Sequence, residues 1–141
     1  YIIAMKHRIL IMSALLVALL LLPSMVVAQT SYQPQIKYVL RHMRITKEKK
    51  AELTPVLVSY YNDINQAKAA RKELKRKYGE AEKNGELTAE QCNLLFASKI
   101  KQEHAELDVR EKYYEEFKKI LTTQQAYNAI RLANDKLTDP E

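Results

Sequence analysis

Residues 53–85 read LTPVLVSYYNDINQAKAARKELKRKYGEAEKNG, and this stretch decides the fold. Its apolar residues recur in alternating steps of three and four, which places them on one face of a helix. The positions on this face are Leu53, Leu57, Tyr60, Ile64, Ala67, Leu74, Tyr78 and Ala81. Arg71 occupies the one place in the series that is not apolar. So long a face is typical of a helix that packs along a partner helix, and Gly85 favours its end because glycine adopts the left-handed terminating conformation.

The start of this long helix has two interpretations. Thr46 is a suitable N-cap residue, and a helix that begins there runs into Pro55, which would kink it. Alternatively, Thr54 caps a new start with Pro55 at the first helical position, where the missing N–H costs nothing. The sequence does not choose between the two.

Three further helices are predicted around the long one. A short helix after Pro34 carries its apolar residues on one face, at Ile36, Val39, Leu40 and Met43. A third helix begins at Thr88 and has an apolar side made of Phe96, Ile100, Leu107, Tyr114, Phe117 and Leu121. A fourth starts at Thr122 and shows Ala126, Ile130, Ala133 and Leu137. No stretch alternates with period two, so we predict an all-α fold, an elongated helical hairpin or bundle of about four helices.

Residues 5–28 have the three parts of a secretory signal peptide. A basic stretch after Met5 leads into the apolar run 9–22, and the small-residue pattern Val26-x-Ala28 follows. We expect translation to start at Met5 and cleavage to follow Ala28, which leaves residues 29–141 as one helical domain in the periplasm. A membrane anchor is the alternative, but the run of 14 residues is shorter than the ~18 to 20 that a bilayer requires.

The predicted mature part is modestly basic and has one cysteine. The whole chain has 23 Lys and Arg against 17 Asp and Glu, and Lys6 and Arg8 leave with the signal peptide. Such an excess alone does not indicate nucleic acid as a partner. Cys92 has no partner in the chain, so the fold must be stable without a disulfide. We expect Cys92 to be a small buried thiol beside Leu87; the alternative is an exposed thiol that links two subunits.

Two short strings repeat where helices begin. Residues 87–91 read LTAEQ, residues 121–125 read LTTQQ, and residues 45–49 carry the degenerate copy ITKEK. In each full copy the Thr side chain can accept from a backbone N–H three residues on, while the Gln side chain reaches back to the Thr N–H. The residues assigned to this helix-capping motif are Thr46, Leu87, Thr88, Gln91, Leu121, Thr122 and Gln125. Ordinary capping boxes explain the strings without any shared function.

An exported helical chain with two LTxxQ strings resembles the Spy/CpxP family of periplasmic proteins, over roughly residues 45–136. The resemblance implies a thin helical fold that commonly forms an antiparallel, cradle-like dimer. It also implies an ATP-independent chaperone, an envelope-stress modulator or a metal-responsive protein. The chain departs from the family pattern at its first copy, where Ile45 and Lys49 replace Leu and Gln, and it has an additional copy at the middle turn.

Basic side chains gather on the long helix between residues 68 and 77. At roughly 100° per residue, most of them share one face beside the apolar seam, and Lys77 points elsewhere. Such a face could hold a non-native polypeptide, because charge speeds the encounter and aromatic or aliphatic side chains make adaptable contacts. The predicted client-binding residues are Lys68, Arg71, Lys72, Lys75, Arg76, Tyr61 and Tyr78. The alternative is a solvated face whose lysine stems cover the margin of the core.

Neither a cofactor nor enzymatic activity is expected. His42 and His104 are the only histidines of the mature part, and neither has a second His or Cys one turn away, so no metal site is predicted. The leading hypothesis is a homodimeric, exported ATP-independent chaperone or envelope-stress protein for unfolded or misfolded envelope proteins. The alternatives are a metal-responsive or regulatory periplasmic protein that acts on a membrane sensor, and a structural helical protein without clients.

Overall fold

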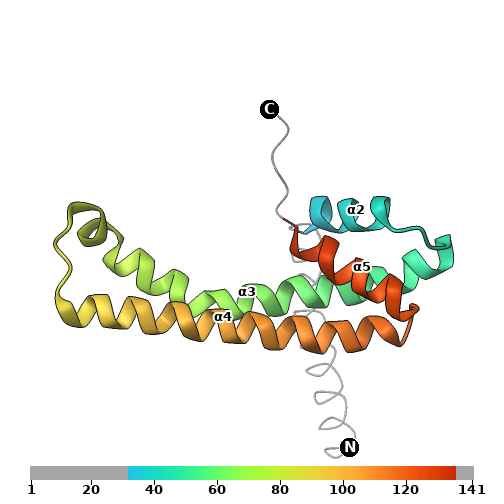
Figure 1. The fold of residues 1–141 in the computed structure, drawn as a ribbon. Coiled ribbons are helices and arrows are strands. Elements are labelled where there is room, and N and C mark those ends of the chain that lie inside the picture. Colours follow the sequence, from blue (N-terminus) through green and yellow to red (C-terminus); the bar gives the residue numbers. More distant parts are fainter. Residues whose placement is uncertain (1–31, 136–141) are drawn as a thin grey trace, which may run out of the picture. The chain divides into compact units, whose positions relative to one another are not determined.

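The computed structural model describes residues 32–135 (Figure 1). The chain divides into two compact units, Tyr1–Pro34 and Gln35–Glu141, and nearly all described residues belong to the second. The predicted signal segment and Leu137 lie outside the described residues. The helices within residues 32–135 are α2 (Gln33–His42), α3 (Lys47–Asn84), α4 (Ala89–Lys118) and α5 (Thr123–Asn134). This part of the chain has no strand, which confirms the all-α class.

The two long helices, α3 and α4, form the predicted hairpin and lie side by side (Figure 1). Gly85 ends α3 in the left-handed conformation, with φ of 71°, and the N–H of Glu86 donates to the carbonyl of Ala81 at 2.8 Å. Near the other end of the hairpin, the carboxylate of Asp63 accepts from Lys112 Nζ and from the Tyr113 hydroxyl, each at 2.9 Å. These bonds join an early part of α3 to a late part of α4, as an antiparallel pair requires.

The start of α3 resolves the choice left open by the sequence. The helix runs from Lys47 to Asn84 without a break, so the interpretation of a new start at Thr54 is wrong. Thr46 is the N-cap, and its hydroxyl oxygen accepts from the N–H of Lys49 at 3.2 Å. Thr54 donates back to the carbonyl of Lys50 at 2.7 Å, which is the bond of a residue inside a helix. Pro55 therefore lies within α3, where it removes one backbone donor.

Completely buried apolar side chains occur at one end of the hairpin, where α2 and α5 join it. The rings of Tyr60, Tyr113 and Phe117 meet there, with centroids 5.6 Å apart for the two tyrosines and 6.5 Å apart for Tyr60 and Phe117. We call residues 35–64 and 106–135 the packed end. The buried apolar residues are Ile36, Val39, Met43, Leu53, Leu57, Tyr60, Ile64, Tyr113, Phe117, Leu121, Ala126, Ala129, Leu132 and Ala133.

Residues 65–105 form the rest of the hairpin, which we call the distal arm. None of its residues is buried, because α3 and α4 have only each other to pack against here. The predicted seam of α3 continues through the arm as half-buried positions, among them Ala67, Leu74 and Tyr78. The predicted seam of α3 is therefore the less exposed face of this helix along its whole length. Only its four residues at the packed end, Leu53, Leu57, Tyr60 and Ile64, are fully buried.

The face of α4 that contacts α3 differs from the predicted one. Phe117 and Leu121 are buried as expected, but Phe96 is 67% exposed and Leu107 is 58% exposed. The positions of α4 that are buried or half-buried in its inner series are Gln91, Leu95, Ser98, Gln102, Glu106, Val109, Tyr113 and Phe117. The packing of Tyr113 and Phe117 against Tyr60 sets the rotation of α4, and a rigid helix carries that rotation into the arm.

The prediction of a buried Cys92 is also wrong, because its thiol is exposed. Gln91 and Leu95 are the half-buried positions next to it in α4, and Cys92 points away from that face. In the distal arm no other helix covers the outer faces of α4 within the described residues, so a side chain that does not face α3 meets solvent.

Candidate functional site

The predicted basic face lies on the distal arm of α3 and is open to solvent. Lys68, Lys72 and Lys75 are exposed, and none of them forms an ion pair with another residue in the range 32–135. Arg76 pairs with Glu73 of its own helix, and this contact lowers the pKa of the Glu73 carboxyl. No carboxylate of α4 neutralises the lysines, so their charge is available to a partner.

Arg71 differs from the lysines because it lies on the seam between the two helices. It is half-buried, and its Nε atom is buried without a hydrogen-bond acceptor among the described residues. A buried guanidinium nitrogen without an acceptor is costly. Arg71 is therefore a cation whose bonding is incomplete in the free chain.

The two tyrosines predicted to bind clients are less accessible than the lysines. Tyr61 is half-buried at the packed end, and its hydroxyl donates to the carbonyl of Ala133 in α5 at 3.3 Å. Burial raises the pKa of Tyr61. Tyr78 is half-buried in the arm, with the Nζ of Lys77 5.1 Å from its ring centroid. The structure therefore places Tyr61 in the packed end, apart from the exposed lysines of the arm.

The position of α5 shows which side of the hairpin the exposed residues occupy. On α3, Tyr61 bonds to α5. On α4, Leu107 and Tyr114 line an open hollow whose other wall is Tyr127 and Ile130 of α5. Tyr61, Leu107 and Tyr114 therefore face the side of the hairpin that carries α5.

Residues seven apart lie on nearly the same line along a helix, two turns from each other. From Tyr61 this line of α3 leads to Lys68 and Lys75. From Tyr114 the corresponding line of α4 leads to Leu107 and to Ile100, which is 38% exposed. Both lines thus continue along the distal arm on the α5 side, past the end of α5. We call this surface the open strip; its residues are Lys68, Lys72, Lys75, Phe96, Ile100 and Leu107.

The opposite edge of the hairpin has different residues. Asp63 lies two positions from Tyr61, about 200° around α3, and pairs there with Lys112. Lys77 follows Asp63 by two heptads, and Lys101 precedes Lys112 by three turns, so both lie on this opposite edge. Leu94 is 45% exposed and shares its line with Lys101. Lys77, Lys101 and Leu94 therefore have the same residue types as the open strip but lie on the opposite edge of the hairpin.

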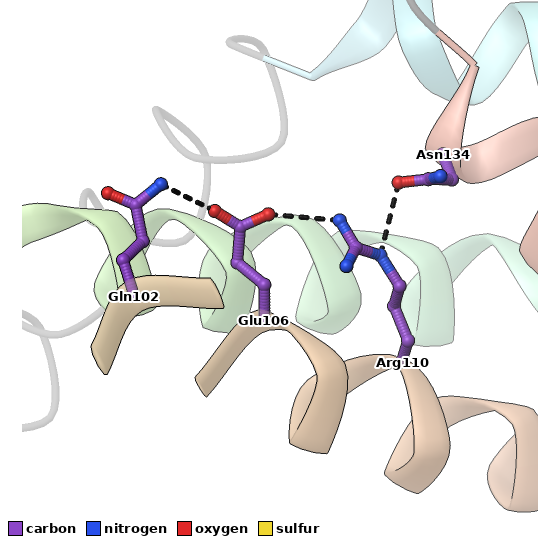
Figure 2. Close-up of polar contacts among 4 residues, drawn as sticks. All are labelled: Gln102, Glu106, Arg110 and Asn134. Atoms are coloured by element: carbon purple, nitrogen blue, oxygen red, sulfur yellow. Dashed lines mark hydrogen bonds and ion pairs between the residues drawn. The ribbon is translucent and has the colours of Figure 1, made fainter. Parts of the chain in front are cut away.

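A polar network joins the inner face of α4 to the end of α5 (Figure 2). Glu106 is 9% exposed; one of its oxygens accepts from Gln102 at 2.7 Å and the other from Arg110 at 2.9 Å. Arg110 also donates from Nε to the side-chain oxygen of Asn134 at 3.1 Å. Both carboxylate oxygens of Glu106 thus accept a hydrogen bond, and one donor is a cation, so the buried charge is compensated at the helix interface. In the sequence, the only signal of this network is the i, i+4 spacing of Gln102, Glu106 and Arg110, and it was not predicted.

The LTxxQ strings form complete capping boxes. Thr88 accepts from the N–H of Gln91 at 3.2 Å, and Gln91 accepts from the N–H of Thr88 at 3.0 Å. Thr122 and Gln125 repeat this arrangement at 3.2 and 3.1 Å. Leu121 is buried, whereas Leu87 is half-buried at the tip of the arm. The strings therefore account for two helix starts.

Comparisons with protein-family models, curated proteins and solved structures found no match for this chain. The likeness to the Spy/CpxP family consequently stays a prediction from the two strings.

The two described histidines lie on different helices, His42 at the end of α2 and His104 on α4. His42 is exposed at the end of α2, where its Nδ1 lies 2.8 Å from the carbonyl oxygen of Tyr38. His104 is exposed on α4. Within residues 32–135, no three His, Cys, Asp or Glu side chains are grouped so that they could hold a metal ion. In the same range, no helix has the length and apolar character of a membrane span.

Proposed function

We propose that this protein is an exported, ATP-independent chaperone or envelope-stress protein that binds unfolded or misfolded polypeptides on the open strip. One observation supports it above all: unpaired lysines of α3 and exposed apolar side chains of α4 lie on the same side of the distal arm. The signal segment predicted at residues 5–28 and the LTxxQ strings agree with a periplasmic location and with the family that the sequence resembles.

The two halves of the strip have different physical roles. Phe96, Ile100 and Leu107 offer apolar area, and an exposed apolar cluster on a helical surface is typical of an interaction site. Lys68, Lys72 and Lys75 raise the rate of encounter with acidic chains, an effect that salt screens over about 10 Å at 0.1 M. A surface that attracts by charge and holds by shallow apolar contact binds many sequences and releases them without ATP.

Dimerisation remains part of this proposal. The arm exposes Leu94 on one edge and Ile100 on the other, so either edge offers a second copy an apolar contact. Sedimentation at micromolar concentration tests for the dimer. If the copies pair through the edge with Leu94, Leu94→Glu gives monomers and Ile100→Glu leaves the dimer intact. If they pair through the edge with Ile100, the two results are exchanged.

An aggregation assay tests the function directly. A client protein that unfolds when its disulfides are reduced is followed by light scattering, with and without an equimolar amount of the mature chain. We expect suppression of scattering in the absence of ATP, and less suppression at high salt. A folded, helical sample that leaves the scattering unchanged at stoichiometric amounts rejects the proposal.

Paired charge reversals assign the activity to the open strip. Lys68→Glu with Lys75→Glu should reduce suppression, because it replaces the attraction with repulsion for acidic chains. Lys77→Glu with Lys101→Glu changes the net charge equally on the opposite edge and should leave suppression unchanged. Equal loss in both double variants shows that net charge, and not the strip, carries the activity.

A further inference from the structure

Helix α5 folds back from the end of α4, crosses the packed end obliquely and does not extend along the distal arm (Figure 1). It contacts α3 through the bond between Tyr61 and Ala133, and it contacts α4 through Arg110 and Asn134. It ends at Asn134. Beyond that point the heptad lines that border α5 continue into the open strip.

We infer that the open strip docks an acidic amphipathic helix of another polypeptide, which lies along α3 and α4 of the distal arm beyond the end of α5. The inference rests on the proposed function, because it takes the open strip as a polypeptide-binding surface and names the kind of segment that the strip selects. An acidic helix is favoured over an apolar one because half of the strip is cationic.

The spacing of the strip matches a helix better than an extended chain. Lys68 and Lys75 are one heptad apart on α3, and Ile100 and Leu107 are one heptad apart on α4, so each pair repeats at about 10 Å along its helix. A third helix with a heptad repeat presents side chains at that same interval. An extended strand repeats its side chains on one face about every 7 Å, so it loses register with the strip.

The charges also specify which way the segment faces. Its acidic side chains meet α3, where, among residues 32–135, Lys68, Lys72 and Lys75 lack ion pairs and the Nε of Arg71 has no acceptor. Its apolar side chains meet α4, where Phe96, Ile100 and Leu107 are exposed and the nearby Glu103 already forms an ion pair with Lys99. Glu82 follows Lys75 by one heptad, so the cationic section ends before the turn at Gly85.

Three synthetic peptides of about 20 residues, which span about 30 Å as helices, test the inference. The first has Leu at the heptad core positions and Glu beside them, the second has Lys in place of Glu, and the third is a scrambled version of the first. Fluorescence anisotropy of the labelled peptides is measured while the mature chain is added. We expect the acidic amphipathic peptide to bind about tenfold more tightly than the other two, as two exposed ion pairs and a matched apolar face would provide.

Variants connect the binding to the strip. Lys68→Glu with Lys75→Glu should reverse the preference toward the lysine peptide, whereas Lys77→Glu with Lys101→Glu should keep it. Ile100→Glu should weaken the acidic peptide, whereas Leu94→Glu, at a similarly exposed position on the opposite edge, should not. Circular dichroism of the mixtures should show more helix than the sum of the separate components.

The outcomes separate this inference from the proposed function. Equal binding of the acidic and scrambled peptides, with aggregation still suppressed, overturns the helix inference and leaves the chaperone function standing. Tight, strip-dependent binding of the acidic peptide without suppression of aggregation supports the docking surface and rejects the chaperone function. A dimer that pairs through Ile100 and excludes the peptide shows that a second copy covers the strip, which also overturns the inference.

Discussion

At the packed end α5 packs on α4, the apolar side chains of α2 are buried, and the side chains of Leu57 and Phe117 are inaccessible to solvent. In the distal arm these two helices have only each other among the helices of residues 32–135, and Phe96 is 67% exposed. The sequence follows this division. The seam of α3 carries only Leu, Tyr and Ile at the packed end, whereas in the arm Ala67, Arg71 and Ala81 alternate with Leu74 and Tyr78.

The difference shows how one pair of helices serves two purposes. Two helices can bury only a narrow seam between them, whereas a third and a fourth are needed to enclose large side chains. The packed end therefore supplies most of the burial that stabilises the fold. The arm keeps its helices through favourable composition and continuity with that end, and its apolar side chains stay available for binding.

The two phenylalanines of the chain give the largest expected contrast. Phe117→Ala removes a completely buried ring at the packed end and should lower the free energy of unfolding by about 3 to 5 kcal/mol. Phe96→Ala removes an exposed ring from the arm and should change it by only about 0.5 kcal/mol. Urea unfolding followed by circular dichroism measures both. A loss above about 2 kcal/mol for Phe96→Ala would mean that the arm is covered in solution.

The next contrast is the response to alkaline pH, which should be confined to the packed end. Burial raises the pKa of Tyr60, Tyr61 and Tyr113 above the ordinary tyrosine value of 10.0. The folded state then holds protons that the unfolded state releases, so stability is complete below about pH 10 and falls as the pH rises through the folded-state values. Urea unfolding at a series of alkaline pH values measures the loss.

A single substitution tests the assignment of that loss. Tyr61→Phe removes one of the three titrating hydroxyls together with its bond to Ala133, so it should cost about 1 kcal/mol at neutral pH and make the alkaline decline shallower. An unchanged decline would show that Tyr61 is not among the groups that destabilise the packed end at high pH.

The sequence predicted the helices of the described residues and the seam of α3 because their signals are local. Thr46, Thr88, Thr122 and Gly85 mark helix ends through bonds made within a few residues. The inner face of α4 could not be predicted in the same way. Its apolar series Phe96, Ile100, Leu107 and Tyr114 has as good a helical period as the true one, and we interpreted it as core.

The true inner face of α4 contains Gln102 and Glu106, which look like surface residues in the sequence. They can be half-buried or buried there because their polar atoms form hydrogen bonds in the network with Arg110 and Asn134. Asn134 belongs to α5, so the sequence of α4 alone does not reveal this network. The lysines of the candidate site were named from the sequence and are exposed in the structure, but their role as a binding surface stays a prediction. The apolar half of the open strip was missed because it was assigned to the interior.

The two capping boxes give a smaller test of the same comparison. Thr122→Ala removes a cap at the packed end and should lower the free energy of global unfolding by about 1 kcal/mol. Thr88→Ala removes the equivalent cap at the tip of the arm, where local opening already requires little energy. Amide hydrogen exchange should show faster exchange in the first turn of α4 for Thr88→Ala, with little change at the packed end. Equal losses of global stability would show that the arm unfolds together with the packed end.

The two glycines of the arm give the smallest effects, of opposite sign. Gly79 lies inside α3 with nothing within 4 Å of the place that a Cβ would occupy, so Gly79→Ala should stabilise the helix by roughly 0.5 to 1 kcal/mol through a lower backbone entropy in the unfolded state. Gly85 has equal space but φ of 71°, so Gly85→Ala should destabilise the turn by about 1 kcal/mol through steric strain.

Urea midpoints and amide exchange of residues in the arm measure both changes. If both variants alter exchange only between residues 65 and 105, the arm opens independently of the packed end, whereas a matching shift in the urea midpoint means that the hairpin unfolds as one unit. A stabilising Gly85→Ala would contradict the assignment of strain to the left-handed turn, because the space around the two glycines is the same and only their backbone conformations differ.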